Sequence, residues 1–408
     1  AFKYISNNET YRHCAERITN ALAARENKNP ATIVTKNDIK VKWLSHLIPH
    51  DGYGASAIEM LDRLIDVPGF AARALPLSIA CEDWIPQKVK DIVEPTIVNS
   101  GVLQVDGADY FLMYSPPIPR TSLHGLSVNV AKEKIIFCMW ESSNIPKYWV
   151  NYINDDFDRI IVPTEWGREQ MLCSGIRVPI SVVNLGVNMS RYSYQERTKT
   201  LPFRFLTYAN DFWDSPRKNC SYVFDAFKQA FGDRHDIELI IKLAKGDEGT
   251  QIARTGKVSN IPKLGQNVRL IEGALPPNEL ASLVQTAHCM LFPSSGEGFG
   301  LPPREAMAAG VPLIVSDSTA LKEIARPDLV WVLPSTKTKP ACDYPACYGN
   351  WNDLGTLDDF NIEDLSYLMK EVHTNYPLAL EKAKAASKWI VNNQTYEHTT
   401  TKLLEILE

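Results

Sequence analysis

The chain has 408 residues, which is enough for two or three domains with separate hydrophobic cores. Hydrophobic residues make up 45% of it and charged residues 22%, a composition that excludes a disordered, collagen-like or coiled-coil protein. The 43 basic and 48 acidic residues give a net charge of -5, so the chain lacks the basic surface with which proteins bind nucleic acid.

The chain opens with a helical pattern and then alternates strands and helices. Tyr11, Cys14, Ile18 and Leu22 have helical spacing, which predicts a helical extension over residues 1–38. Weaker strand signals follow at 42–47, 110–114 and 134–139. Clearer β-branched runs, separated by helical stretches, lie at 159–163, 180–183, 204–208, 237–242, 268–271, 289–292 and 311–315. This alternation is typical of parallel sheets built from βαβ units, and two such sheets would account for the length.

Two stretches interrupt this alternation. The polar segment 188–202 has little to bury and predicts a linker between two αβ halves. The segment 335–361 is rich in Pro, Asp, Gly and Asn, which predicts either a binding or lid insertion or a solvated decoration. We expect an extension over 1–38, domains over 39–190 and 191–385, and final helices over 386–408.

The cellular compartment can be inferred from hydropathy and cysteine spacing. No apolar run approaches the roughly 20 residues that span a bilayer, and no secretory leader pattern occurs at Ala1. The eight cysteines lack CxxC spacing, and Cys342 and Cys347 have no partners that would complete a metal site. We expect a cytoplasmic protein whose membrane contact is peripheral at most.

A glycine-rich loop carries the clearest chemical signal. It follows the apolar run 289–292, contains Gly296, Gly298 and Gly300, and leads into a helix with prolines at its start. Ligands bind at the carboxyl edge of parallel sheets, where glycines admit a ligand to the backbone and helix N–H groups favour phosphate. Glu297 and Glu305 should face one pocket mouth there. Carboxylates accept hydrogen bonds from hydroxyls, so this pocket favours a polyhydroxylated ligand.

These residues resemble the retaining glycosyltransferases of family GT4. The spacing from Glu297 to Glu305 is similar to that family's E-x7-E signature. Five other segments match in the family's order, at 139–146, 161–164, 183–187, 216–219 and 310–314, and the resemblance covers about residues 42–408. It implies the GT-B fold, in which two Rossmann-like domains face each other across a cleft. The acceptor would bind mainly in the first domain and the nucleotide-sugar donor in the second, and the last helices would cross back to the first domain.

The resemblance also implies roles for single residues in the donor site. Glu305 would bind the ribose hydroxyls of the nucleotide, and Glu297 the hydroxyls of the donor sugar. The backbone of Phe299, Gly300 and Leu301 would meet the sugar and the diphosphate. An alternative for Glu305 is a carboxylate that only stabilises the start of its helix.

A leaving diphosphate needs fixed positive charge, and several cations are candidates to supply it. Lys218 has the family's phosphate-binding position, and Arg217 beside it either assists or caps a helix. The arginine that many relatives carry shortly before this pair is absent from segment 209–214. Lys242 and Lys245, at and beyond the end of a predicted strand, are further candidates or else surface lysines.

The first half should hold the acceptor. Gly52, Tyr53 and Gly54 lie in a second glycine segment after a predicted strand, which either borders the diphosphate or acceptor or simply forms a tight turn. Glu141 matches the family's Trp-Glu pair and either orients an acceptor hydroxyl or is structural. His50 and His124 lie in loops of this half without a catalytic assignment, and we expect His288 to be a packed residue.

No metal or bound cofactor is expected. Asp156 and Asp158 have the D-x-D form of a metal motif, but they precede a strand and therefore lie at the amino edge, away from the expected cleft. The family is independent of divalent cations, which agrees with this position. The co-substrate would be a UDP- or GDP-linked sugar.

The reaction implied is transfer of a hexose or similar sugar to a hydroxyl of a glycan, lipid or small molecule, with retention of the anomeric configuration (class EC 2.4). No carboxylate is a secure nucleophile, which favours front-face transfer assisted by the leaving phosphate. Two alternatives stay open: a GT-B sugar-nucleotide epimerase, and a catalytically inactive protein that binds nucleotide sugars or glycans. The absent arginine motivates the second alternative.

Overall fold

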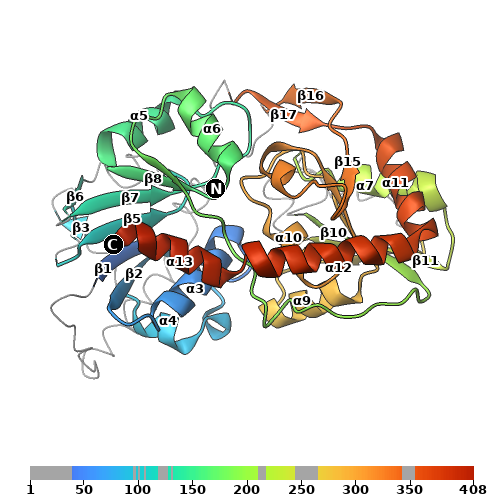
Figure 1. Ribbon diagram of the computed structural model, residues 1–408, viewed down its shortest axis with the longest axis horizontal. Helices are drawn as coiled ribbons and strands as arrows, with labels where there is room; N and C mark the ends of the chain where they lie inside the picture. The colour runs from blue at the N-terminus through green and yellow to red at the C-terminus, as the bar shows by residue number, and fades with distance from the viewer. Residues whose placement is uncertain are drawn as a thin grey trace.

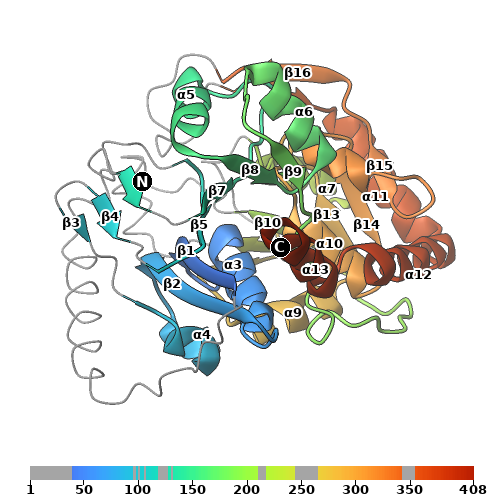
Figure 2. The same cartoon turned by 60° about the vertical axis from the view of Figure 1, so that its left-hand side comes forward.

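The protein contains two parallel β-sheets that lie side by side, each with its own helices (Figures 1 and 2). The sheets are the centres of what we call the first and second halves. The structure is a computed structural model, and it describes residues 39–94, 98–99, 102–104, 107–117, 127–129, 132–209, 217–243, 265–341 and 354–408. The predicted extension over 1–38 lies outside these ranges.

The first half is built on a six-stranded sheet of order β2-β1-β5-β7-β8-β9, in which every pairing is parallel. The strand β5 reads YFLMY and is buried throughout, as expected for a central strand covered on both faces. The strands are β1 (Ile39–Leu47), β2 (Phe70–Ile79), β5 (Tyr110–Tyr114), β7 (Glu133–Phe137), β8 (Arg159–Val162) and β9 (Ile180–Val182). The helices are α3 (Gly52–Leu64), α4 (Gln87–Asp91), α5 (Lys147–Asp156) and α6 (Glu165–Ser174).

The second half has a six-stranded parallel sheet of order β12-β11-β10-β13-β14-β15. In both sheets the strand order reverses next to the first strand of the half, which makes a topological switch point at the carboxyl edge. The strands are β10 (Phe203–Ala209), β11 (Ile237–Leu243), β12 (Val268–Ile271), β13 (Cys289–Phe292), β14 (Leu313–Ser316) and β15 (Trp331–Leu333). The helices are α7 (Cys220–Phe231), α9 (Pro277–Thr286), α10 (Leu301–Ala308) and α11 (Ile362–Thr374).

Short elements complete the described chain. A small sheet of order β3-β4-β6 adjoins the first half, and a hairpin formed by β16 and β17 extends the second. Their bounds are β3 (Val98–Asn99), β4 (Val102–Gln104), β6 (Ser127–Asn129), β16 (Lys337–Pro340) and β17 (Thr356–Asp359), and two 3-10 turns span Glu82–Trp84 and Thr319–Glu323.

The hairpin joins the two halves. The Ser143 N–H of the first half donates to Thr356 O at 3.0 Å, and Ser142 Oγ donates to Leu354 O at 2.7 Å. The side chains of Leu354 and Leu357 are buried in a hydrophobic cluster of the first half. The end of segment 335–361 that contains β17 is therefore packed on the first half, whereas β16 is mostly exposed, and residues 342–353 lie outside the described ranges.

The last two helices run across the front of both halves (Figure 1). Helix α12 (Tyr376–Asn393) packs against α10 of the second half, and α13 (Tyr396–Leu407) packs against α3 of the first. Leu403 and Leu407 belong to the core cluster of the first half. Val187 N donates to Gln394 O at 2.9 Å, so the two segments that connect the halves are bonded to each other.

The linker 188–202 buries little, as predicted, because Tyr192 is its one buried residue and the others are half-buried or exposed. Tyr192 is 3% exposed. The Arg197 guanidinium donates to four carbonyl oxygens at the ends of α9 and α10, at 2.7 to 3.1 Å, those of Gln285, Ala287, Ala309 and Gly310. Helix ends leave carbonyl groups without intrahelical partners, and a guanidinium can bind several of them at once. The Arg197 side chain of the linker therefore satisfies carbonyl groups at the ends of α9 and α10.

A close approach at Gly54 fixes the first turn of α3 against the end of β1. A Cβ atom at Gly54 would lie 2.4 Å from the N and O atoms of Ile48, whereas one at Gly52 would have nothing within 4 Å. We expect Gly54→Ala to lower the free energy of unfolding by about 1–3 kcal/mol through this overlap. Gly52→Ala should be neutral or gain up to about 1 kcal/mol from helix propensity.

The measurement is the thermal unfolding midpoint of both variants. Equal midpoints for the two alanine variants would show that the backbone at Ile48 moves aside without cost.

Candidate active site

The glycine loop between β13 and α10 is buried from residue 293 to residue 300. A Cβ atom at Gly296 would lie 2.2 Å from Glu141 O, and one at Gly298 would lie 2.6 Å from Met139 Cβ. These two glycines therefore admit the backbone of the first half, which is a different role from the expected close approach of a ligand. The carboxyl ends of β7 and β13 meet at this contact.

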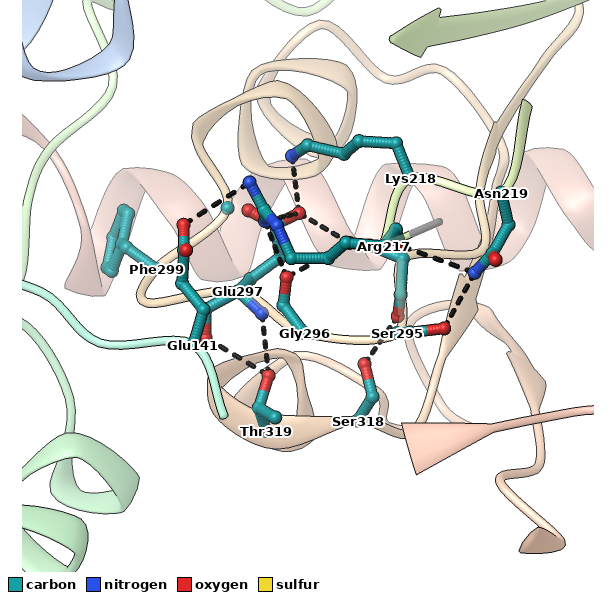
Figure 3. Close-up of polar contacts among 12 residues, drawn as sticks. Glu141, Arg217, Lys218, Asn219, Ser295, Gly296, Glu297, Phe299, Ser318 and Thr319 are labelled. Carbon is teal, nitrogen blue, oxygen red and sulfur yellow. Dashed lines mark hydrogen bonds and ion pairs between the residues drawn. The ribbon is translucent and has the colours of Figure 1, made fainter. Parts of the chain in front are cut away.

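Glu297 is held by two cations and a hydroxyl (Figure 3). Its Oε1 accepts from Arg217 Nη1 at 3.0 Å and from Ser294 Oγ at 2.6 Å, and it is bonded to Lys218 Nζ. The residue is 6% exposed, so its charge needs these partners. Lys218 also lies over the ring of Phe292, 4.9 Å from its centre.

Glu141 completes this cluster from the other half. Its Oε1 lies 3.3 Å from Arg217 Nη2, while Arg217 Nη1 also donates to Gly296 O at 2.6 Å. The structure therefore brings Glu141, which was expected on the acceptor side, to Glu297, Lys218 and Arg217, which were expected in the donor site. Two carboxylates and two cations, drawn from both halves, line the same contact.

Burial and pairing act against each other on the pKa values here. Burial is the largest influence on Glu297 and would raise its pKa, but the charges of Lys218 and Arg217, with the bonds from Lys218 and Ser294, hold that pKa below its ordinary value. Burial also lowers the pKa of Lys218, and the attraction of Glu297 opposes this.

Glu305 lies on α10 in a different environment. Burial raises its pKa to about 7, opposed by a hydrogen bond from the Tyr192 hydroxyl and by the charge of Arg191. Glu59, on α3 of the first half, accepts from Arg191 Nη1 at 2.7 Å and adds a repulsion that raises this pKa further. The Tyr208 hydroxyl, at the end of β10, is buried without a hydrogen-bond partner among the described residues. Two tyrosines thus accompany Glu305 at this edge.

Lys242 lies at the carboxyl end of β11 and is 5% exposed. Its Nζ donates to Leu243 O at 2.7 Å and to Gly273 O, and burial lowers its pKa to about 8. It is therefore not a surface lysine. Its charge is one of the causes that lower the pKa of His50, after burial and against the attraction of Asp51, so the loop after β1 lies close to the end of β11.

The remaining donor-loop residues have distinct positions. The Phe299 side chain is 1% exposed and packs in the core cluster of the first half. Gly300 has φ +84°, a left-handed conformation that favours glycine, and Leu301 begins α10. The backbone role expected for Phe299, Gly300 and Leu301 in donor binding stays a prediction.

The second glycine segment forms the start of a helix. Gly52, Tyr53 and Gly54 are the first residues of α3, and the Tyr53 hydroxyl accepts from Met139 N at 2.8 Å. Gly54 is required by the close approach to Ile48. These contacts give Tyr53 and Gly54 structural roles, and Gly52 has open space at its α-carbon.

Sequence reasoning missed the residues that hold Glu297 from the backbone side. Thr319 Oγ1 accepts from Glu297 N at 2.7 Å and lies 3.0 Å from Glu297 O, and Thr319 has φ +42°. Asn219 Nδ2 donates to Ser295 Oγ at 2.7 Å and to Pro293 O at 2.8 Å. No motif in the sequence points to Thr319, whereas Asn219 directly follows Arg217 and Lys218 and its position next to them is a signal for it.

His288 and Asp158 both make hydrogen bonds to backbone N–H groups. His288 is buried and accepts from Arg204 N at 3.0 Å, so it is a packed residue as expected. Asp158 accepts from Lys134 N at 2.8 Å at the amino end of β8. Within the described ranges no group of three or more His, Cys, Asp or Glu side chains is placed to hold a metal. His124, Lys245, Cys342 and Cys347 lie outside those ranges.

A family model described as "Glycosyl transferases group 1" matches residues 213–338. This match contains Lys218, Glu297 and Glu305, and it covers most of the second half. The MMP alpha-(1->4)-mannosyltransferase of Mycolicibacterium hassiacum is 34% identical over 151 residues, which are 36% of this chain and 34% of that protein. The phosphatidyl-myo-inositol mannosyltransferase of Mycobacterium leprae is 27% identical over 164 residues, 40% of each chain. The chain thus spans well under half the length of these two curated relatives.

Solved structures match nearly the whole chain. HepE from Anabaena, solved in complex with UDP and glucose, is 12% identical with a TM-score of 0.64 over 90% of this chain and 99% of that one. The sucrose-phosphate synthase of Thermosynechococcus elongatus is 13% identical with a TM-score of 0.65 over 90% and 98%. These similarities, with the two parallel sheets, show that the chain has the GT-B fold.

Within the part of the chain that the structure describes, no helix is both long and apolar enough to cross a membrane.

The opposite pKa shifts of the two signature carboxylates predict opposite effects of pH. Glu305 has a folded-state pKa of about 7 against an ordinary 4.5, so its favourable contribution is complete below about pH 4.5 and is lost as the pH rises through 7. We expect Glu305→Gln to gain stability relative to the unmodified protein over this range, by on the order of 2 kcal/mol.

Glu297→Gln is the matched comparison. Because the folded-state pKa of Glu297 is lowered, its contribution is present at neutral pH and lost on acidification, so this variant should be least stable relative to the unmodified protein near pH 7. Unfolding midpoints from about pH 4 to pH 8 test both trends. Parallel trends for the two variants would contradict the assigned environments.

Proposed function

We propose that the chain is a glycosyltransferase that moves a sugar from a nucleotide-sugar donor to a hydroxyl of an acceptor. The observation that carries this proposal is the cluster of Lys218 and Arg217 with Glu297 and Glu141 at the meeting of the two carboxyl edges. It lies largely within the segment that matches group 1 glycosyl transferases. The GT-B fold supports binding of a donor in the second half and an acceptor in the first.

The two cations suit a leaving nucleoside diphosphate. Lys218 and Arg217 are held by Glu297 in the loop before α10, and positive charge at that place would stabilise a diphosphate as it separates from the sugar. Lys242, buried at the neighbouring strand end, is a third candidate. Glu305 would accept hydrogen bonds from the ribose, replacing the bond that Tyr192 now makes.

We propose a reaction with retention, without a divalent metal. The bond between the anomeric carbon and the diphosphate oxygen breaks, the acceptor oxygen bonds to that carbon on the same face, and the acceptor proton passes to the leaving phosphate. Glu297 would bind donor-sugar hydroxyls. Glu141, on the first half, would orient the acceptor hydroxyl.

The relatives guide the choice of donor and acceptor. The two curated relatives described above are named mannosyltransferases, and HepE was solved with UDP and glucose. GDP-mannose and UDP-glucose are therefore the first donors to test. The acceptor would be a carbohydrate or a lipid-linked molecule.

Nucleotide binding and turnover together test the function. The protein is heated in EDTA with UDP, GDP, ADP and their sugar conjugates, beside Glu305→Ala. One base class at about 100 times its Kd should add roughly 2.7 kcal/mol of stability, and much less in the variant. Release of nucleoside diphosphate that requires both donor and acceptor would establish transfer.

Two results would count against the proposal. If no nucleotide stabilises the protein at concentrations above about 1 mM, the assignment of the donor site is contradicted. A donor that binds but is never consumed across a broad acceptor panel would favour a binding protein, and conversion of the donor without an acceptor would favour an epimerase.

Loss of the Lys218 charge should slow the chemical step. We expect Lys218→Met to lower kcat by about 100-fold or more, since fixed charges on a leaving group have effects of this size. Lys228→Met is the control, because Lys228 lies on α7, the helix that follows Lys218, and its side chain is bonded to Asp233 at 2.8 Å. Steady-state rates with saturating donor compare the two. Equal rates would exclude Lys218 from the reaction.

A further inference from the structure

Arg304 is a completely buried cation next to the signature residue Glu305. It is the fourth residue of α10, and its side chain reaches back toward the loop before the helix. Nη1 donates to the carbonyl oxygens of Phe299 and of Gly300, the latter at 3.2 Å, and the guanidinium carbon lies 3.8 Å from the centre of the Phe299 ring. A buried charge persists only with such partners.

The two bonds to carbonyl oxygens orient two peptide groups. In a trans peptide the C=O and the following N–H point to opposite sides. Because the carbonyls of Phe299 and Gly300 face Arg304, the N–H groups of Gly300 and Leu301 face away from it. No hydrogen bond among the described residues is donated by either N–H. Both donors are therefore available at the start of α10.

Arg304 is also joined, through Gln394 and Glu323, to two places where the halves are bonded to each other. Its Nε donates to Gln394 Oε1 at 2.8 Å, and Gln394 O accepts from Val187 N at 2.9 Å where the two connecting segments meet. Its Nη2 lies 3.5 Å from Glu323 Oε2, and Glu323 Oε1 accepts from the N–H of Glu165, the first residue of α6 in the first half, at 3.0 Å.

We propose that Arg304 is a positioning residue of the donor site, which presents the Gly300 and Leu301 N–H groups to the diphosphate and couples their position to the contact between the halves. This inference rests on the proposed function. It assigns to Arg304 no contact with the substrate. The effect passes through the backbone of 299–301 and through Gln394 and Glu323.

Substitutions at the two ends of α10 provide a matched test. Arg304→Lys keeps the charge but loses the forked geometry, and Arg197→Lys makes the same change at an arginine that binds Ala309 O and Gly310 O past the helix end. Titration calorimetry of the full chain measures Kd for the nucleoside diphosphate and for the monophosphate of the same base. The ratio of these two constants reports the contacts to the second phosphate.

We expect Arg304→Lys to weaken diphosphate binding by about tenfold and monophosphate binding much less. The reason is that the Gly300 and Leu301 N–H groups would lose their alignment for hydrogen bonds to the charged second phosphate. Arg197→Lys should leave the ratio unchanged even where it lowers the unfolding midpoint. Glu323→Gln, at a partly exposed side chain, should shift the ratio in the same direction by about threefold and provides the test if Arg304→Lys does not fold.

Equal ratios in the Arg304, Glu323 and Arg197 variants would overturn the positioning role and leave Arg304 a structural residue. If the unmodified protein binds no nucleoside diphosphate, the proposed function itself fails, and the two failures are thereby distinguished.

Discussion

The buried carboxylate of Glu297 is the constraint on which the candidate site depends. A charge that is withdrawn from water must be paired, and its partners Arg217 and Lys218 come from the segment before α7. Arg217 in turn reaches Glu141 in the other half. Because this one buried carboxylate needs its partners, three chain segments from both halves meet at the same place. The glycines at 296 and 298 make this possible because any side chain there would collide with the first half.

The same contact organises the surrounding elements. Asp358 N, in β17, donates to Ser295 O at 3.1 Å, so the hairpin that packs on the first half is also bonded to the loop that carries Glu297. Thr319 holds the backbone of Glu297 from the opposite side. The loop is consequently fixed before any ligand binds, which is the preorganisation that stabilising a leaving charge requires.

The sequence predicted the parts whose signals are local. The βαβ alternation, the helix α10 with its prolines, and the grouping of Glu297 with Lys218 and Arg217 follow from short motifs in order. It could not predict β2 or the hairpin, because the Pro-containing run 70–79 and the short strands β16 and β17 have weak patterns of their own. Nor could it predict Thr319 or the depth of Arg304, since both depend on contacts between residues far apart in the chain. The polar linker was predicted, but the bonds from Arg197 to the helix ends were not, because they join residues about ninety to a hundred and ten positions apart.

The crossing of α13 back to the first half has a consequence for synthesis of the chain. Leu403 and Leu407 fill the same core as Val41 and Trp43, which are made more than three hundred residues earlier. The core of the first half is incomplete until α13 has been translated, so its sheet stays partly uncovered while the second half is being made. A truncation that removes α13 would therefore destabilise the first half, although the sheet of that half is translated long before α13.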